Sequence, residues 1–501
     1  MNLKKSLWQK DIGQNNFKVL DKNIKTDILI VGGGITGLTS AYYLMDKKYN
    51  VVLLEADKFF FGCTCKSTGK LTYLQDLKLQ DIYNIYDFNT VKLYYEAQKD
   101  GIRLVKKIVK ENEIDCDLKK CSSITFTNDD KELNKFDTEQ KLLDELGVKY
   151  YTNDVEFEKE KVKRLIMVKN TYTFNPVKYL KGLLKVIRKA NNIKIYERSR
   201  VTKIKKEDKY YIAYANGYEV EAKKIVVACN YPFFTIPGFI PFKTYVEKSY
   251  INATKVTSEK DICGITSNYP TISFRYYNDK QNYYFVYLNN SSKICDKLNY
   301  KKNYDECVNE SRKITGRVPT YKWTNMDVMT NDFLPIIGRI SSDDKNVFIA
   351  TGYNTWGMTN GTIAGKIIYD LVRNCNNKYT DIFNPSRSLT IKKVKNFVLN
   401  TMIPNAKSYS FNLVKKNPYW YKDKAFVTNI NGKRVGIYYD NDGKKHTVLN
   451  VCPHLKCFLT FNEVDKTWDC PCHGSRFDVD GNVVKGPSCY NIKIDETTSE
   501  S

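Results

Sequence analysis

The sequence predicts an α/β nucleotide-binding domain interleaved with an α+β antiparallel-sheet domain, followed by a small all-β domain. Three observations support this division of the 501 residues. A βαβ pattern with a glycine-rich turn begins at Asp27, alternating apolar and polar residues fill the middle, and short segments separated by Asn-Gly and Asp-Gly pairs occupy the end. A chain of this length exceeds one ordinary hydrophobic core, so several domains are expected.

The βαβ pattern contains the first binding motif. A strand (DILIV), a turn (GGGITG), a helical pattern and a second strand (VVLLE) follow one another from Asp27 to Glu55. Gly32, Gly34 and Gly37 form a GxGxxG turn, which lets a pyrophosphate approach the positive end of a helix. Glu55 ends the next strand, where an acid can bind a ribose hydroxyl. This pattern alone does not distinguish an NAD site from an FAD site. A glycine-rich turn without a ligand is a further alternative.

The middle of the chain mixes helical and strand patterns. Asn175 before a proline predicts the start of a helix that runs to Ala190. Between Tyr245 and Leu288 the residues alternate, with a turn near Asn278, which predicts an antiparallel sheet. We therefore expect a substrate domain interleaved with the nucleotide-binding domain.

The last part of the chain has a different pattern. Residues 388–418 are basic, with a weak helical stripe before Pro404 that favours a bridging helix over a membrane-surface helix. After Pro418, turn pairs mark hairpins of a small all-β domain. The turn pairs are Asn431-Gly432, Asp442-Gly443 and Asp480-Gly481. The predicted parts are 1–386, a connection at 387–417, and 418–501.

Bulk composition excludes several classes of protein. Residues are 42% hydrophobic and 27% charged, and no segment approaches the roughly 20 apolar residues that cross a bilayer. The N-terminus lacks the apolar core of a secretory signal, so we expect a cytoplasmic protein, with peripheral membrane contact as an alternative. Lys and Arg exceed Asp and Glu by 80 to 56. These basic residues are scattered rather than clustered, which disfavours a nucleic-acid partner.

Four segments of the first 386 residues resemble one flavoprotein family. They are GGGITGL, CKSTGKLT at 65–72, DFLPIIGR at 332–339 and TGYNTWGMTNGTIAG at 351–365. Together they resemble the D-amino acid oxidase and glycine oxidase family, which implies an FAD-binding Rossmann-like domain. Some members hold FAD through a Cys or His just before the segment that matches DFLPIIGR. Here that stretch, KWTNMDVMTN, has neither residue, so we expect noncovalent FAD.

The resemblance also implies individual flavin contacts. Ser67 and Thr68 would lie near the flavin, and Val201 would contact the adenine end. Three residues would put backbone groups against the flavin ring, where reduced flavin develops negative charge: Gly357, Met358 and Thr359.

The substrate residues are marked less strongly. Arg275, with Tyr276 beside it, could pair with a substrate carboxylate as a bidentate guanidinium would, although an exposed structural role fits the pattern equally well. Tyr245 and Trp323 are further candidates. No acid or base is marked by spacing, and amine oxidation by flavin requires none when the neutral amine delivers a hydride directly.

Cysteine and histidine concentrate at the C-terminus. The chain has 14 cysteines and only three histidines. Cys452 and His454 form one close pair, and Cys470 and His473 form another fifteen or more residues later. Two thiolates and two imidazoles suit either a two-iron cluster or a tetrahedral zinc ion.

The surrounding segments resemble the Rieske family of the cytochrome bc type. CPHLKC, CPCHGSRFD and the Gly486-Pro487 pair carry the likeness. It implies a [2Fe-2S] cluster with Cys452 and Cys470 on one iron and His454 and His473 on the other. It also implies a disulfide between Cys457 and Cys472, with two free thiols as the alternative.

Three further residues bear on the potential of such a cluster. The resemblance implies that the Ser475 hydroxyl reaches a cluster sulfur, and it puts Phe477 where high-potential members carry tyrosine. A missing donor leaves a reduced cluster less stabilised, so we expect a potential below the top of the roughly −150 to +300 mV Rieske span. Lys456 stands where many relatives have glycine and adds a charge.

The two halves suggest a dehydrogenase. It would oxidise a small-molecule amine or amino acid at FAD and send electrons through the cluster to an external acceptor, either a protein or a quinone. One alternative is an electron-transfer protein without a small-molecule substrate. Another is a flavin oxidase fused to a zinc-stabilised interaction domain.

Overall fold

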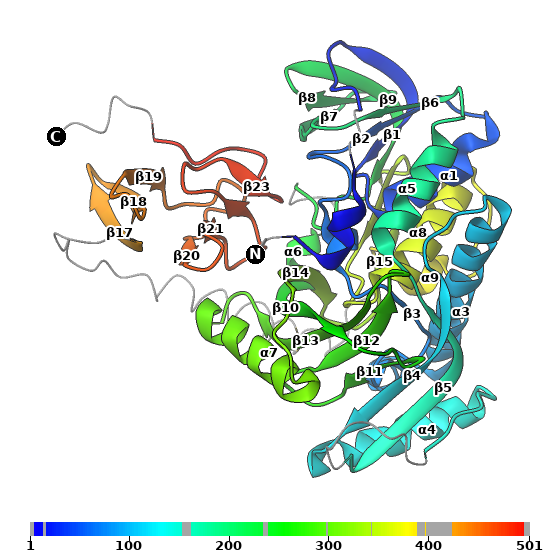
Figure 1. Cartoon of the computed structure of the whole chain (residues 1–501). Helices are drawn as coiled ribbons and strands as arrows, with labels where there is room; N and C mark the ends of the chain where they lie inside the picture. Colours follow the sequence, from blue (N-terminus) through cyan, green and yellow to red (C-terminus); the bar gives the residue numbers. More distant parts are fainter. Residues whose placement is uncertain are drawn as a thin grey trace.

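The chain folds into a large body with a smaller C-terminal domain beside it, drawn in orange and red in Figure 1. The computed structural model describes residues 5–13, 17–152, 162–233, 239–296, 299–341, 343–387, 396 and 423–494. Over these ranges it contains two eight-stranded sheets and two small sheets of three and four strands. The predicted fold class is confirmed.

The first large sheet contains the βαβ unit. β1 (Ile24–Val31) pairs in parallel with β2 (Val51–Leu54) on one side and with β9 (Tyr218–Val227) on the other. Parallel strands are buried on both faces, which explains the continuous apolar runs of β1 and β2. The other strands are β6 (Ile193–Tyr196), β7 (Val201–Lys206), β8 (Tyr211–Ala215), β15 (Ile336–Arg339) and β16 (Val347–Thr351).

Helices pack closely on this sheet. α1 (Ile35–Tyr43) follows the glycine turn and lies against α8 (Gly357–Val372). A Cβ added at Gly365 would come within 2.7 Å of the Thr39 Cβ, so the two helices approach as only a glycine allows. α5 (Pro176–Ile187) confirms the predicted helix start, because the Asn175 side chain accepts hydrogen bonds from two backbone amides of the first turn. The helix ends at Ile187, three residues before the predicted end at Ala190.

The second large sheet is mostly antiparallel and draws on two separate stretches of chain. β10 (Thr244–Val256) pairs with β13 (Tyr283–Lys293) and with β14 (Tyr321–Thr330). β4 (Lys119–Thr127) and β11 (Ile262–Thr266) pair in parallel and join the two stretches into one sheet, which is the predicted interleaving. The remaining strands are β3 (Lys70–Leu71), β4 (Lys119–Thr127), β5 (Arg164–Thr173), β11 (Ile262–Thr266) and β12 (Ser273–Asn278).

The remaining helices surround the two sheets. None of the helices in the described ranges is long and apolar enough to cross a membrane. The α-helices are α2 (Lys78–Tyr83), α3 (Phe88–Glu111), α4 (Leu133–Glu145), α6 (Ile240–Lys243), α7 (Tyr300–Thr315) and α9 (Thr380–Phe383). The 3-10 helices are η1 (Leu7–Asp11), η2 (Leu44–Asp46), η3 (Cys63–Lys66) and η4 (Asp130–Glu132).

The C-terminal domain is all β, as predicted. The Asn-Gly and Asp-Gly pairs all fall between its paired strands. Its strands are β17 (Lys424–Ile430), β18 (Lys433–Tyr439), β19 (Lys445–Leu449), β20 (Thr460–Asn462), β21 (Thr467–Asp469), β22 (Arg476–Phe477) and β23 (Val483–Lys485). The predicted bridging helix before Pro404 lies outside the described residues, apart from Asn396, and the predicted domain boundaries stay predictions.

A buried charge network joins this domain to the larger body. Lys248 of β10 is fully buried, and its Nζ lies 3.3 Å from Asp469 Oδ2 of β21. Arg476 Nε lies 2.9 Å from the other oxygen of Asp469. Asp465 joins the network through Arg476, at 2.7 Å, and lies 3.9 Å from the lysine. A lysine is rarely fully buried unless it is paired, so the domain supplies the carboxylates that this position requires.

Candidate functional site

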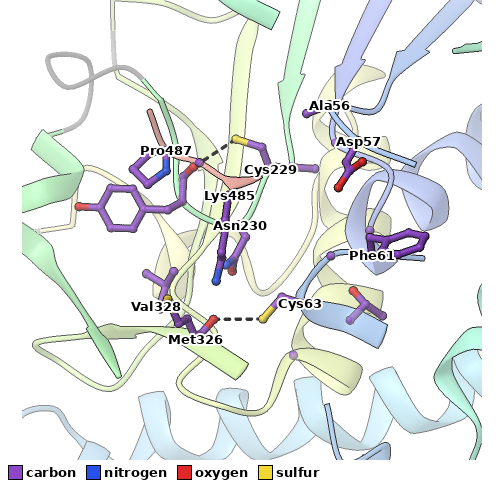
Figure 2. Close-up of a pocket in the computed structure, with 18 of the residues that line it drawn as sticks. Ala56, Asp57, Phe61, Cys63, Cys229, Asn230, Met326, Val328, Lys485 and Pro487 are labelled. Carbon is purple, nitrogen blue, oxygen red and sulfur yellow. Dashed lines mark hydrogen bonds between the residues drawn. The ribbon is translucent and has the colours of Figure 1, made fainter. Parts of the chain in front are cut away.

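One cavity of about 270 Å³ lies where the two large sheets and the C-terminal domain meet. Figure 2 shows residues from all three regions around it, among them Asp57, Met326 and Lys485. The glycine turn and the end of β2 form one side, residues 324–328 of β14 form another, and residues 484–487 of the C-terminal domain form a third.

The glycine turn has the shape that a dinucleotide requires. Gly32 has a φ of 109°, and a Cβ there would lie 2.5 Å from the carbonyl oxygen of Ala228. A Cβ at Gly37 would lie 1.9 Å from the carbonyl oxygen of Gly32, so side chains are excluded at both positions. Gly34 precedes the first residue of α1, and both residues border the cavity. The N-terminal end of the helix therefore faces a space that an anionic pyrophosphate fits.

Glu55 is fixed by the same turn. Its Oε2 accepts a hydrogen bond from the Gly33 amide at 2.7 Å, and its Oε1 accepts one from the Asp57 amide at 3.0 Å. Burial raises the pKa of this carboxyl group, and the two amides oppose that shift. The side chain borders the cavity, which is consistent with the predicted ribose contact.

The other predicted flavin residues fall into two groups. Those that border the cavity are Ser67, Val201, Gly357 and Met358. Thr359 is buried, and its hydroxyl donates to Gln98 Oε1 at 2.6 Å. The carbonyl of Thr68 accepts a hydrogen bond from Arg275 at 2.9 Å. A flavin contact by Thr359 would therefore come from its backbone, and the flavin contacts of both threonines stay predictions.

Arg275 has a different position from the predicted one. Its side chain is 1% exposed and lies outside the described lining of the cavity. Its Nη1 donates to the carbonyls of Thr68, Gly69 and Phe174 at 2.8 to 2.9 Å. Two of these bonds hold the loop that follows Ser67. Arg275 therefore makes buried structural bonds, and its predicted bond to a substrate carboxylate stays a prediction.

The remaining substrate candidates also lie away from the described cavity wall. The ring of Tyr276 packs against Phe285 in the sheet core, 5.3 Å between centroids. Trp323 is buried, and its indole donates to the Lys66 carbonyl at 2.8 Å. Tyr245 is half-buried, with Lys293 Nζ 5.3 Å from its ring centroid. The sequence could not show this, because alternation along a strand indicates which face of the sheet a residue occupies but not which segment covers that face.

Two cavity residues were not predicted from the sequence. The thiol of Cys63 donates to Asn325 Oδ1 at 3.0 Å and to the Met326 carbonyl at 3.1 Å, the latter drawn in Figure 2. Asp327 lies beside them, and burial raises its pKa to about 6. In the sequence, the stretch that carries Asp327 indicates only that a covalent flavin link is absent. An acid with a shifted pKa in a cavity is a typical sign of function, but the shift depends on the fold and not on a local motif.

The four predicted cluster ligands come together on two neighbouring loops. The Cys452 amide donates to the Cys457 carbonyl at 2.8 Å and closes the first loop. The Cys470 amide donates to the Ser475 carbonyl at 2.7 Å and closes the second. The thiols of Cys452 and Cys470 interact, and that contact holds the pKa of Cys452 below its ordinary value, at about 7.

The histidines have the features of metal ligands. The rings of His454 and His473 lie 5.1 Å apart between centroids. All four ring nitrogens are buried and lack a hydrogen-bond partner within the described part of the chain. Burial lowers the pKa of His454 to about 4 and that of His473 to about 3, so both rings are neutral. Buried polar atoms are normally satisfied, so these nitrogens fit coordination to an iron ion.

The predicted disulfide is present. Cys457 and Cys472 are bonded, with their Cα atoms 6.5 Å apart, and the bond joins the two ligand loops. The alternative of two free thiols is therefore not observed. Since both sulfurs are used, Cys452 and Cys470 are the two thiols left for iron on these loops.

Three residues surround the predicted ligands. The Ser475 hydroxyl interacts with the Cys452 thiol and accepts a hydrogen bond from the Ser488 amide at 2.9 Å. Phe477 is fully buried. Lys456 has a φ of 60°, which is the left-handed conformation that favours glycine.

Comparisons with known proteins agree with both halves. Residues 27–371 match the family described as FAD dependent oxidoreductase, and residues 411–495 match the Rieske [2Fe-2S] domain. A protein of Bacillus subtilis (strain 168), named "Putative Rieske 2Fe-2S iron-sulfur protein YhfW", is 30% identical over 97% of this chain and 96% of its own length. The gamma-glutamylputrescine oxidoreductase of Escherichia coli (strain K12) is 26% identical over 71% of this chain and 86% of its own.

Solved structures show the same fold for the larger body. Glycine oxidase from Geobacillus kaustophilus has a TM-score of 0.61 at 14% identity and covers 73% of this chain and 100% of its own. L-proline dehydrogenase from P. horikoshii has a TM-score of 0.60 at 16% identity and covers 72% of this chain and 97% of its own. The Rieske match replaces the zinc alternative with a [2Fe-2S] cluster. The chain therefore belongs to the FAD dependent oxidoreductase family, binds FAD, and carries a Rieske [2Fe-2S] domain at its C-terminal end.

Proposed function

We propose that this oxidoreductase is a dehydrogenase that oxidises an amine or amino acid at its flavin and sends the electrons through the Rieske cluster to an external protein or quinone. One observation carries the proposal: the cavity bordered by Gly32 and Gly34 is also bordered by the cluster ligand His473. Tyr231 borders it too, with its ring centroid 5.0 Å from that of His473 and 6.1 Å from that of His454. Adjacent sites for two redox groups favour electron transfer between them.

The substrate class follows from the family and from one relative. The Escherichia coli relative is named for gamma-glutamylputrescine, which is an amine, and it aligns with most of the flavoprotein half. An amine or amino acid is also the substrate class that the sequence resemblance implies. This support concerns the class and not an individual compound.

Residues of both halves would hold the two groups. We propose that FAD is bound by Gly32, Gly34, Gly37, Glu55, Ser67, Thr68, Val201, Gly357, Met358 and Thr359. We propose that the cluster is bound by Cys452, His454, Cys470 and His473. FAD supplies two-electron acceptance and the cluster supplies one-electron transfer.

Asp327 is the cavity group best suited to handle a proton. A substrate amine must be neutral to give up a hydride, and most amines carry a proton at neutral pH. With a pKa of about 6, the Asp327 carboxylate is ionised at neutral pH and can accept that proton or pair with the ammonium form. We propose this role for Asp327, since the sequence marks no acid or base by spacing.

The experiment is an anaerobic screen of amines and amino acids against the purified holoprotein. A substrate should bleach the flavin absorbance, and the EPR signal of a reduced Rieske cluster should follow. If no compound reduces the flavin while a reduced protein donor does, the dehydrogenase proposal fails and the chain acts as an electron-transfer protein.

A further inference from the structure

The Rieske domain supplies part of the wall of the flavin cavity. Residues 484–487 and Cys489 follow β22 in the chain and border the same space as the glycine turn. A Cβ added at Gly486 would lie 3.8 Å from an Arg200 nitrogen, and the Cys489 thiol donates to the Val201 carbonyl at 3.5 Å. Val201 is the residue expected at the adenine end, so the domain reaches along the flavin site.

Lys485 is the residue of this wall that carries a charge into the cavity. Figure 2 shows its side chain in the cavity beside Asn230, with Pro487 on one side and Cys63 on the other. Its ammonium makes no hydrogen bond or ion pair with any residue that the structure describes. Burial and the positive charge of Arg476 lower the pKa of this lysine, while Cys63, Asp327 and Asp469 oppose the shift without being in contact with the ammonium.

The position of Lys485 is fixed from its own domain. It pairs with Arg476 across β22 and β23, and Arg476 is bound to Asp469, the main partner of Lys248. The buried network that joins the domain to β10 therefore also holds β23 against the cavity. Holding the Lys485 ammonium in this cavity without a bonded protein partner costs free energy unless a ligand supplies electronegative atoms.

We propose that the Rieske domain closes the FAD cavity and that Lys485 is an FAD-binding residue contributed by that domain. Phosphate oxygens and the electron-rich edge of the flavin ring are the groups of FAD that an ammonium can bind. The inference rests on FAD binding by this cavity and is independent of substrate oxidation and of electron transfer to the cluster. It implies that FAD is retained only while the Rieske domain is docked.

The test uses the full-length holoprotein and three variants. Lys485→Met removes the charge, Lys485→Arg keeps it, and Lys445→Met makes the same change at an exposed position of the same domain. The FAD dissociation constant is measured by titrating flavin-stripped protein, and the flavin midpoint potential by spectroelectrochemistry. We expect Lys485→Met to weaken FAD binding by about tenfold or more, as loss of a buried ionic hydrogen bond would. Lys485→Arg should remain within about threefold, and Lys445→Met should match the unmodified protein.

The two readouts locate the group that the lysine binds. A lower flavin potential in Lys485→Met would indicate the flavin ring, and weaker binding at an unchanged potential would indicate the pyrophosphate. Unchanged affinity and potential, with the EPR signal of the cluster intact, would overturn the proposal.

A labelling measurement on the unmodified protein tests the proposal even if the Lys485 variants fail to fold. An amine-reactive reagent is applied to the flavin-stripped and the FAD-loaded forms, and modification is read by mass spectrometry. FAD should protect Lys485 and leave Lys445 equally reactive in both forms. Equal labelling of Lys485 in the two forms would contradict its role in binding FAD, whatever the electron-transfer experiments show.

Discussion

At the scale of single residues, the cavity contains an acid with a shifted pKa. Asp327 has a pKa of about 6 because burial disfavours its charged form. Its carboxylate therefore forms as the pH rises through about 6, which is the form that accepts a proton.

We predict that the rate constant of flavin reduction by an amine substrate rises with pH across this region. Asp327→Asn should lose that rise and lower the rate constant by roughly 100-fold, a typical contribution of general base catalysis. Stopped-flow absorbance over a pH series measures both effects. Asp57→Asn changes another acid of the same cavity and should keep the rise. A rise that persists in Asp327→Asn would rule out this residue as the base.

A second residue-scale prediction concerns the cluster potential. Phe477 is fully buried where a tyrosine would add a hydrogen-bond donor near the ligand loops. A hydrogen bond of about 1 kcal/mol to the reduced cluster corresponds to about 40 mV in a one-electron couple. Phe477→Tyr should raise the potential by this order in an EPR-monitored redox titration. Phe461→Tyr, a half-buried site in the same domain, should leave it unchanged. Equal potentials in all three proteins would contradict the prediction.

At the scale of elements, the local patterns could be predicted and the tertiary contacts could not. The GxGxxG turn, the Asn175 cap and the hairpin turns are set by neighbours in the sequence, and the structure has them where the patterns indicate. The predicted cluster ligands meet on two neighbouring loops, as their short motifs indicate. The contacts of Arg275 could not be predicted, because its partners on the loop at Thr68 and Gly69 are about 200 residues away.

We expect the docking of the Rieske domain to depend on Lys248 of β10, which pairs with Asp469. Lys248→Glu would put a third carboxylate beside Asp465 and Asp469 in a buried network. Breaking such a network is expected to destabilise the docked state by about 3 kcal/mol or more. Hydrogen exchange of residues 460–477 should therefore become faster. Lys255→Glu makes the same change at the exposed end of β10 and should have no such effect. Unchanged exchange in Lys248→Glu would mean that other contacts hold the domain.

At the scale of the whole molecule, two domains with separate sequence signatures share one cavity. The flavin half provides the glycine turn and the sheet wall, and the Rieske half provides His473 and Lys485. The sequence indicates both cofactors but not this arrangement, because their motifs lie more than 400 residues apart in the chain. In the proposed function, this docking brings the two redox groups close enough for electrons to pass between them.

The most direct test of this path is the rate at which the cluster becomes reduced after the flavin is reduced anaerobically. Rapid-freeze EPR follows the cluster while absorbance follows the flavin, at several protein concentrations. Transfer within one chain predicts a first-order rate constant that does not change with protein concentration, and a slower one in Lys248→Glu. A rate that increases in proportion to protein concentration, or a cluster that stays oxidised, would contradict an internal connection between the two cofactors.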